Sequence, residues 1–145
     1  MAAQGSVMIT TRCGPIEYQE AAAGTPLLMV HGSGGGHDQG MAFAGNLAQQ
    51  GVRVIAMSRF GYLRTPMPAD ESPAAQADAH VCLLNALGIA RAAVMTALAP
   101  TLALSTASQI KGAKFVGFEQ GGHVWVGHQD EVMTEVENLL NRVGL

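Results

Sequence analysis

The chain has 145 residues, the size of about one domain, so we expect residues 1–145 to form a single compact domain around one core. Hydrophobic residues make up 48% of the sequence and charged residues 13%, which excludes a disordered chain and a coiled coil. The formal net charge of −3 gives no electrostatic reason to expect nucleic acid or a membrane surface as a partner, and favours a small neutral or apolar ligand.

Strand and helix patterns alternate along the chain. A hairpin is predicted first, at 7–11 and 16–22, because Gly14-Pro15 is typical of a turn. Short apolar runs then predict buried strands, and apolar residues at helical spacing predict helices. In chain order these are a strand at 26–30, a helix at 41–50, a strand at 52–57, a helix at 72–88, a strand at 92–95, a helix at 101–110, a strand at 114–118 and a helix at about 130–142.

This alternation predicts an α/β protein, a three-layer sandwich with a mainly parallel sheet and helices on both faces. Ligands of such sheets bind beyond the carboxyl ends of the strands. The segments that follow the predicted strands are therefore the places to search, and they are 31–38, 58–64, 96–100 and 119–123.

Cys13 and Cys82 stand far apart in the sequence and fit neither a disulfide framework nor a paired zinc motif. We interpret both as reduced thiols. The N-terminal residues have neither the basic region nor the apolar core of a secretory signal, and no apolar run is long enough to span a membrane. The sequence therefore predicts a soluble, cytoplasmic protein.

The segment from His31 to Gly36 is the richest in glycine, and it follows the first buried strand. It lacks the lysine of a phosphate-binding loop and the glycine spacing of a dinucleotide site, so the nucleotide interpretation is weak. An oxyanion loop fits better, with the amides of Gly32, Ser33 and Gly34 stabilising a developing negative charge. A tight turn without chemistry is the alternative.

His123 follows Gly121 and Gly122 just after the last predicted strand. An imidazole there could accept the proton of a nucleophile near neutral pH. A single histidine is more often structural, but this one is predicted at the same sheet edge as the glycine loop.

Together, the segment 27–32, the loop at 58–62, the helix at 72–88 and the Gly121-Gly122-His123 turn resemble the α/β-hydrolase fold family, nearly from end to end. The resemblance implies a minimal α/β-hydrolase-like fold, with His31-Gly32 as the oxyanion motif and His123 as the catalytic histidine. It also implies hydrolysis of esters or related acyl compounds by a serine, a histidine and an acid.

One family motif is absent. Where the Gly-x-Ser-x-Gly nucleophile motif is expected, the chain reads Thr96-Ala97-Leu98-Ala99-Pro100, with leucine in place of serine. The middle of the family fold, including the loop with the catalytic acid, is also missing, so the chain looks like a miniature of the fold.

Three other hydroxyls are predicted at the active edge, those of Ser33, Ser58 and Thr96. We choose Ser58 as the nucleophile, because it stands at a strand end, and assign Thr96 to substrate binding. A hydroxyl that forms a turn is the simpler interpretation of Ser58. Glu119 is the acid that we assign to orient His123, with Asp38 as an alternative.

Two further interpretations are weaker. A metal site would need nitrogen and oxygen ligands to converge, but no pair has the helical His-x-x-x-His spacing, so we expect no metal and no cofactor. The residues concerned are His37, Asp38, His123, His128 and Asp130. Arg59 and Arg64 are placed to hold a substrate carboxylate, although a solvated loop explains them equally well.

We therefore predict a small esterase, or acyl hydrolase, acting on small esters or similar neutral substrates. The alternative is a non-catalytic remnant of the fold that binds a small ligand or a protein. A shortened fold leaves a sheet edge and apolar helix faces to be covered, so we also predict a homodimer, with Trp125 in its interface or in a pocket wall.

Overall fold

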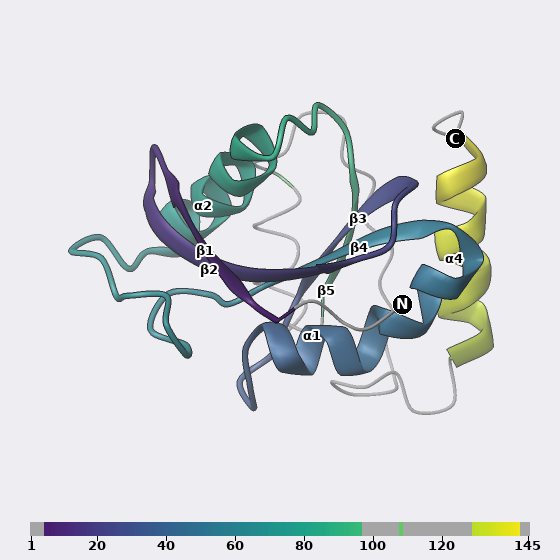
Figure 1. The fold of residues 1–145 in the computed structure, drawn as a ribbon, viewed down its shortest axis with the longest axis horizontal. Coiled ribbons are helices and arrows are strands. Elements are labelled where there is room, and N and C mark those ends of the chain that lie inside the picture. The colour runs from purple at the N-terminus through teal and green to yellow at the C-terminus, as the bar shows by residue number, and fades with distance from the viewer. Residues whose placement is uncertain (1–4, 97–107, 109–128, 143–145) are drawn as a thin grey trace.

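The computed structural model describes residues 5–96, 108 and 129–142. In these ranges the chain forms a five-stranded sheet with helices on both of its faces (Figure 1). The strands are β1 (Val7–Thr11), β2 (Gly14–Ala21), β3 (Thr25–Val30), β4 (Val52–Met57) and β5 (Ala93–Thr96). The helices are α1 (His37–Ala44), the 3₁₀ helix η1 (Gly45–Gln50), α2 (Pro73–Ala86) and α4 (Gln129–Arg142).

The strands lie in the order β1-β2-β4-β3-β5. Strand β3 pairs in parallel with β4 and with β5, whereas β2 runs antiparallel to both β1 and β4. The chain crosses from β3 to β4 through α1 and η1, and from β4 to β5 through α2. The predicted α/β sandwich is confirmed, and the N-terminal hairpin makes its sheet a mixed one.

Alternate residues of the central strands point to opposite faces, which gives the sheet two cores. On β4, Val54 and Ala56 pack on the side of α1, η1 and α4, while Ile55 and Met57 pack on the side of α2. All four side chains are fully buried. This burial on both faces explains why β3 and β4 appear in the sequence as continuous apolar runs.

The helix boundaries differ in part from the predicted ones. Helix α1 begins at His37 rather than at residue 41, and the chain tightens into the 3₁₀ helix η1 at Gly45. The start of α2 is as predicted, because the Ser72 hydroxyl accepts a hydrogen bond from the amide of Ala75 at 3.1 Å. The predicted helix at 101–110, apart from residue 108, and the predicted strand at 114–118 lie outside the described residues.

The prediction of two reduced thiols is wrong. Cys13, in the turn between β1 and β2, forms a disulfide with Cys82 of α2, and their Cα atoms lie 6.0 Å apart. The two positions are 69 residues apart, and only the packing of α2 beside the hairpin brings them together. Because disulfides persist mainly in oxidising compartments, the cysteines no longer support a cytoplasmic location.

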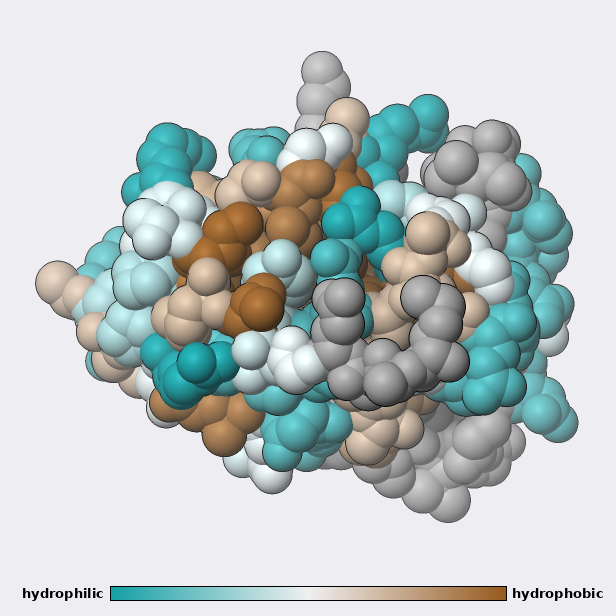
Figure 2. Space-filling view, in the orientation of Figure 1, coloured by the Kyte–Doolittle hydropathy of each residue, from teal (hydrophilic) through white to brown (hydrophobic). Residues whose placement is uncertain are grey.

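Part of the surface is apolar. Figure 2 shows apolar atoms gathered near the middle of the face that carries the hairpin in Figure 1. Val7 and Met8 of the edge strand β1 are 47% and 40% exposed.

Among the helices that the structure describes, none has the length and apolar character needed to cross a bilayer.

We predict that reduction of the disulfide lowers the free energy of unfolding by about 3 to 4 kcal/mol, because the crosslink closes a long loop in the unfolded chain. Urea unfolding with and without dithiothreitol measures the difference. The Cys13→Ser/Cys82→Ser double variant should match the reduced protein and ignore the reductant. Two free thiols in the denatured, unreduced protein would contradict the pairing.

Candidate active site

Three strand ends meet at one edge of the sheet. In the parallel register Val30, the last residue of β3, lies between Met57 of β4 and Thr96 of β5. The segments that start at His31 and Ser58 therefore leave the sheet side by side. The edge at which the sequence places its candidate residues is thus formed by neighbouring strands.

His31 is a buried anchor of this edge. Its Nδ1 lies 2.6 Å from the carbonyl oxygen of Gly32, and its Nε2 accepts a hydrogen bond from the amide of Arg59 at 2.9 Å. These partners fix the tautomer with the proton on Nδ1. Burial lowers the pKa of His31 to about 4, so the ring is neutral at physiological pH.

The Gly32 carbonyl has a second donor. Nη2 of Arg59 lies 3.0 Å from the same oxygen, so His31 and Arg59 hold it from the protein side. In a trans peptide the C=O and the following N–H point in opposite directions. The amide of Ser33 therefore points away from Arg59, and Ser33 itself is exposed.

The amides of the loop differ in their availability. Gly32 N–H donates to Oε1 of Gln39 and Gly36 N–H to Oδ1 of Asp38, each at 2.8 Å. No hydrogen bond among the described residues engages the amide of Ser33 or of Gly34. Of the three donors predicted from the sequence, Gly32 is engaged, whereas the amides of Ser33 and Gly34 have no partner among the described residues.

Gly36 ends the loop at a point of close approach. A Cβ atom on Gly36 would lie 2.8 Å from the Ser58 hydroxyl oxygen and 2.6 Å from Cδ1 of Leu63. A larger residue here would press on the buried Ser58 hydroxyl and would require the exposed Leu63 side chain to move.

Ser58 is completely buried. Its hydroxyl accepts from the amide of His37 at 3.1 Å and donates to Oε2 of Glu17 at 3.3 Å. The assignment of Ser58 as nucleophile stays a prediction, because its assigned base, His123, lies outside the described residues. A hydroxyl that is withdrawn from solvent and bonded on both sides also fits the simpler, structural interpretation of Ser58.

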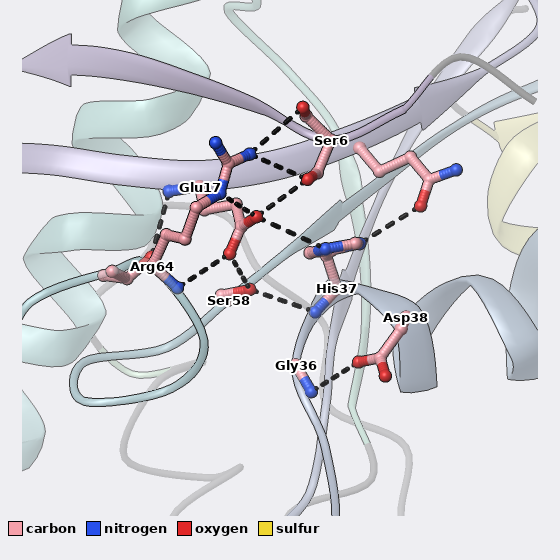
Figure 3. Close-up of polar contacts among 9 residues, drawn as sticks. Ser6, Glu17, Gly36, His37, Asp38, Ser58 and Arg64 are labelled. Atoms are coloured by element: carbon pink, nitrogen blue, oxygen red, sulfur yellow. Dashed lines mark hydrogen bonds and ion pairs between the residues drawn. The ribbon is translucent and has the colours of Figure 1, made fainter.

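Glu17 is the centre of a polar cluster that the sequence did not reveal (Figure 3). Its carboxylate accepts from Ser6 Oγ and Arg64 Nε, both at 2.7 Å, and from the amide of Arg64 at 2.9 Å. Nε2 of His37 lies 3.5 Å away. Glu17 is only 2% exposed, so these partners replace the water that a buried charge loses.

Two opposing effects set the pKa of Glu17. Burial raises it, but the hydrogen bonds from Arg64 and Ser6 and the nearby His37 outweigh burial and bring the pKa from 4.5 to about 2. The carboxylate therefore stays ionised at neutral pH and cannot act there as a proton acceptor of useful strength.

Helix α2 contacts the loop that follows β4 at this edge of the sheet. Oε1 of Gln76 accepts from the amide of Phe60 at 2.9 Å, and Nε2 of Gln76 lies 3.3 Å from Nε2 of His80. His80 is completely buried, and its burial lowers its pKa to about 3. The sequence showed His80 only as part of a helix, and its contact with the edge depends on the packing of α2.

The remaining predicted residues are placed as follows. Thr96 ends β5 and is half-buried, whereas Glu119, His123, Trp125 and His128 lie outside the described residues. Asp38 is bonded to Gly36, His37 faces Glu17 and Gln19, and Asp130 is exposed near the start of α4. Within the described ranges, no three histidine, cysteine or acidic side chains gather as metal ligands would.

The two arginines of the loop after β4 both have partners within the chain. The guanidinium group of Arg59 lies 5.0 Å from the ring centre of Tyr62 and bonds Gly32, while Arg64 is paired with Glu17. Arg59 positions the glycine loop, and Arg64 anchors its own loop to β2.

No protein-family model matches the sequence, and no curated protein matches it significantly. Solved structures do resemble it. An α/β hydrolase fold protein from Nakamurella multipartita is 39% identical over 63% of this chain, with a TM-score of 0.61. An epoxide hydrolase from an endophytic Streptomyces is 24% identical over 74% of the chain, with a TM-score of 0.66.

A third similar structure is that of AidH, an N-acyl homoserine lactonase complexed with N-hexanoyl homoserine. It is 32% identical over 62% of this chain, with a TM-score of 0.52. The described part of the chain therefore has an α/β-hydrolase-like fold. The match spans only about a third of these structures: 32% of the first, 34% of the second and 34% of the third.

We predict that Glu17 makes stability depend on acid pH. Because the pKa of Glu17 is lower in the folded chain than its ordinary 4.5, its contribution is complete above that value and is lost as the pH falls toward 2. Urea unfolding should show this contribution falling by about 2 kcal/mol between pH 7 and pH 3.

The Glu17→Gln variant should lack this part of the pH dependence. The matched control is Glu20→Gln on the same strand, because Glu20 pairs with Arg53 while 31% of its side chain is exposed. A partly exposed pair of this kind contributes about 1 kcal/mol or less. Equal acid sensitivity in both variants would contradict the role of Glu17.

Proposed function

We propose that the chain is an acyl hydrolase of the α/β-hydrolase type that acts on small esters, with the His31–Gly36 loop as its oxyanion hole. The observation that supports this proposal is the orientation of the Ser33 amide. His31 and Arg59 hold the Gly32 carbonyl on the protein side, so the free N–H of Ser33 points away from it at the carboxyl edge of the sheet.

The similar structures support the same kind of chemistry. One is named an epoxide hydrolase and another an N-acyl homoserine lactonase. Opening a lactone or an epoxide leaves negative charge on an oxygen atom, as ester hydrolysis does in its tetrahedral intermediate. Amide donors fixed in advance stabilise such an oxygen without reorganisation.

In the proposed reaction a hydroxyl attacks the ester carbonyl carbon and gives its proton to His123, which Glu119 orients. The carbonyl oxygen becomes negative and accepts hydrogen bonds from Ser33 and Gly34. The intermediate collapses, and the alcohol leaves with the proton from His123. Water then attacks the acyl carbon and gives a proton to His123. The second intermediate collapses, the hydroxyl nucleophile takes the proton back, and the acid is released.

The proposed reaction needs a hydroxyl group as its nucleophile. Ser58 is the sequence-based choice, with Ser33 and Thr96 as alternatives. Because the Ser58 hydroxyl is bonded on both sides and completely buried, an attack by Ser58 requires the contact with Glu17 to open first. Ser33, which is exposed, faces no such requirement.

A second candidate function is binding without turnover. Two observations favour it: leucine stands at position 98, where the family motif has its serine, and Ser58 is withdrawn from solvent. In that case the Ser33 and Gly34 amides would bind the carboxylate or carbonyl oxygen of a small ligand, which would be released unchanged. We also propose that two copies of the chain form a homodimer.

We predict that Ser33→Pro lowers kcat for p-nitrophenyl butyrate by about 10²- to 10³-fold, because proline removes the amide donor. The matched control is Ser33→Ala, which keeps the N–H and keeps the activity when Ser58 is the nucleophile. Loss of activity in both variants, with loss of fluorophosphonate labelling in Ser33→Ala, would instead assign Ser33 as the nucleophile. Hydrolysis that is equal in the proline and alanine variants would remove the oxyanion role of this amide.

Two further measurements separate the candidates in the same preparation. The hydrolase proposal requires that His123→Ala abolish turnover, and that a fluorophosphonate label one serine. Labelling of Ser33→Ala and Ser58→Ala then identifies that serine. A protein that is neither labelled nor active, yet binds a carboxylate at Ser33, is the binding protein.

A further inference from the structure

Leu63 has an unusual backbone conformation. Its φ angle is +50°, in the left-handed region that bulky side chains avoid. Among the described residues other than glycine, only Ala22 also has a positive φ. The Leu63 side chain is 58% exposed, so burial of this leucine does not explain the conformation.

The conformation is imposed by the residues that follow Leu63. The amide and Nε of Arg64 both donate to the Glu17 carboxylate, at 2.9 and 2.7 Å. The amide of Thr65 donates to the Tyr62 carbonyl at 3.1 Å, and its hydroxyl accepts from the Glu17 amide at 2.9 Å. The loop is thus anchored to β2 immediately after Leu63, and Leu63 is held outward.

The Leu63 side chain lies against the glycine loop. Its Cδ1 and Cγ would be 2.6 and 2.9 Å from a Cβ atom on Gly36, so the Leu63 side chain packs directly against this glycine. Gly36 is the last residue of the loop that presents the Ser33 and Gly34 amides. An exposed apolar side chain therefore lies against the last residue of this loop, and an apolar surface beside polar groups is the combination that binding sites for small acyl compounds present.

We propose that Leu63 binds the apolar acyl chain of the substrate and sets the preferred chain length. This inference rests on the proposed function, because it assigns the apolar part of the same site. A single exposed leucine is ordinary on a protein surface. Leu63 differs from such a residue in three ways: its backbone is strained, the Glu17 cluster fixes it, and it contacts the oxyanion loop.

The loop after β4 also contains a residue that can serve as a matched control. Met67 is 55% exposed, nearly as much as Leu63, but it lies against Gly61 rather than Gly36. The test variant is Leu63→Gly, which removes the side chain and suits a positive φ. Leu63→Asn is a second test variant, because asparagine tolerates this region while being polar. Neither should lower the melting temperature, whereas loss of a structural leucine would.

The experiment uses butyrate and octanoate as probes, followed at the Ser33 and Gly34 amide signals by NMR. A carboxylate offers an anionic oxygen to the loop, and the longer acid extends its chain past it. In the wild-type protein octanoate should bind at least about fivefold more tightly than butyrate, because more methylene groups are buried. The ratio should fall to about one in Leu63→Gly and Leu63→Asn and persist in Met67→Ala.

An unchanged ratio in the Leu63 variants, or no binding of either acid by the wild-type protein, would overturn the proposal. Hydrolysis of p-nitrophenyl butyrate and octanoate is measured on the same samples. If the octanoate preference is present in the wild-type protein and lost in the Leu63 variants, but no ester is hydrolysed, the role of Leu63 is supported and the hydrolase function is removed. If the esters are hydrolysed, but the chain-length preference in binding and in hydrolysis is the same in the Leu63 variants as in the wild-type protein, the hydrolase function is supported and the role of Leu63 is removed.

Discussion

A buried negative charge holds this part of the molecule together. Taking the Glu17 carboxylate out of water is costly unless donors replace the water, and a partly satisfied cluster would be worse than an apolar one. The donors come from Ser6, Ser58 and Arg64, and His37 at the start of α1 lies beside them. One charge therefore fixes the relative positions of β2, the loop after β4 and the first turn of α1.

The same logic links the Glu17 cluster to the glycine loop. Arg59 lies a few residues before Arg64, and its amide and guanidinium group bond His31 and the Gly32 carbonyl. The loop after β4 is thus tied to β2 at one end and to the glycine loop at the other. Because the Ser33 amide takes its direction from the Gly32 carbonyl, its orientation depends on contacts several residues away.

The sequence predicted what depends on local pattern. The apolar runs 26–30 and 52–57 correspond to β3 and β4, and Ser72 caps α2, because burial and capping are visible in neighbouring residues. It missed what depends on distant partners. Nothing near Glu17 indicates Arg64, and nothing near Cys13 indicates Cys82, because each pairing exists only once the strands and α2 have packed. The sequence predicts the site residues from their positions at strand ends, but it does not predict their hydrogen-bonding partners.

The described histidines also limit where proton transfer can occur. His31 is neutral and bonded at both ring nitrogens, His37 faces Gln19 and Glu17, and His80 is completely buried on α2. None of these three rings is hydrogen-bonded to the hydroxyl of Ser33 or Ser58. A general base must be within hydrogen-bonding reach of the proton that it accepts. In the proposed hydrolase we assign that role to His123, which follows the segment predicted to end at the same sheet edge.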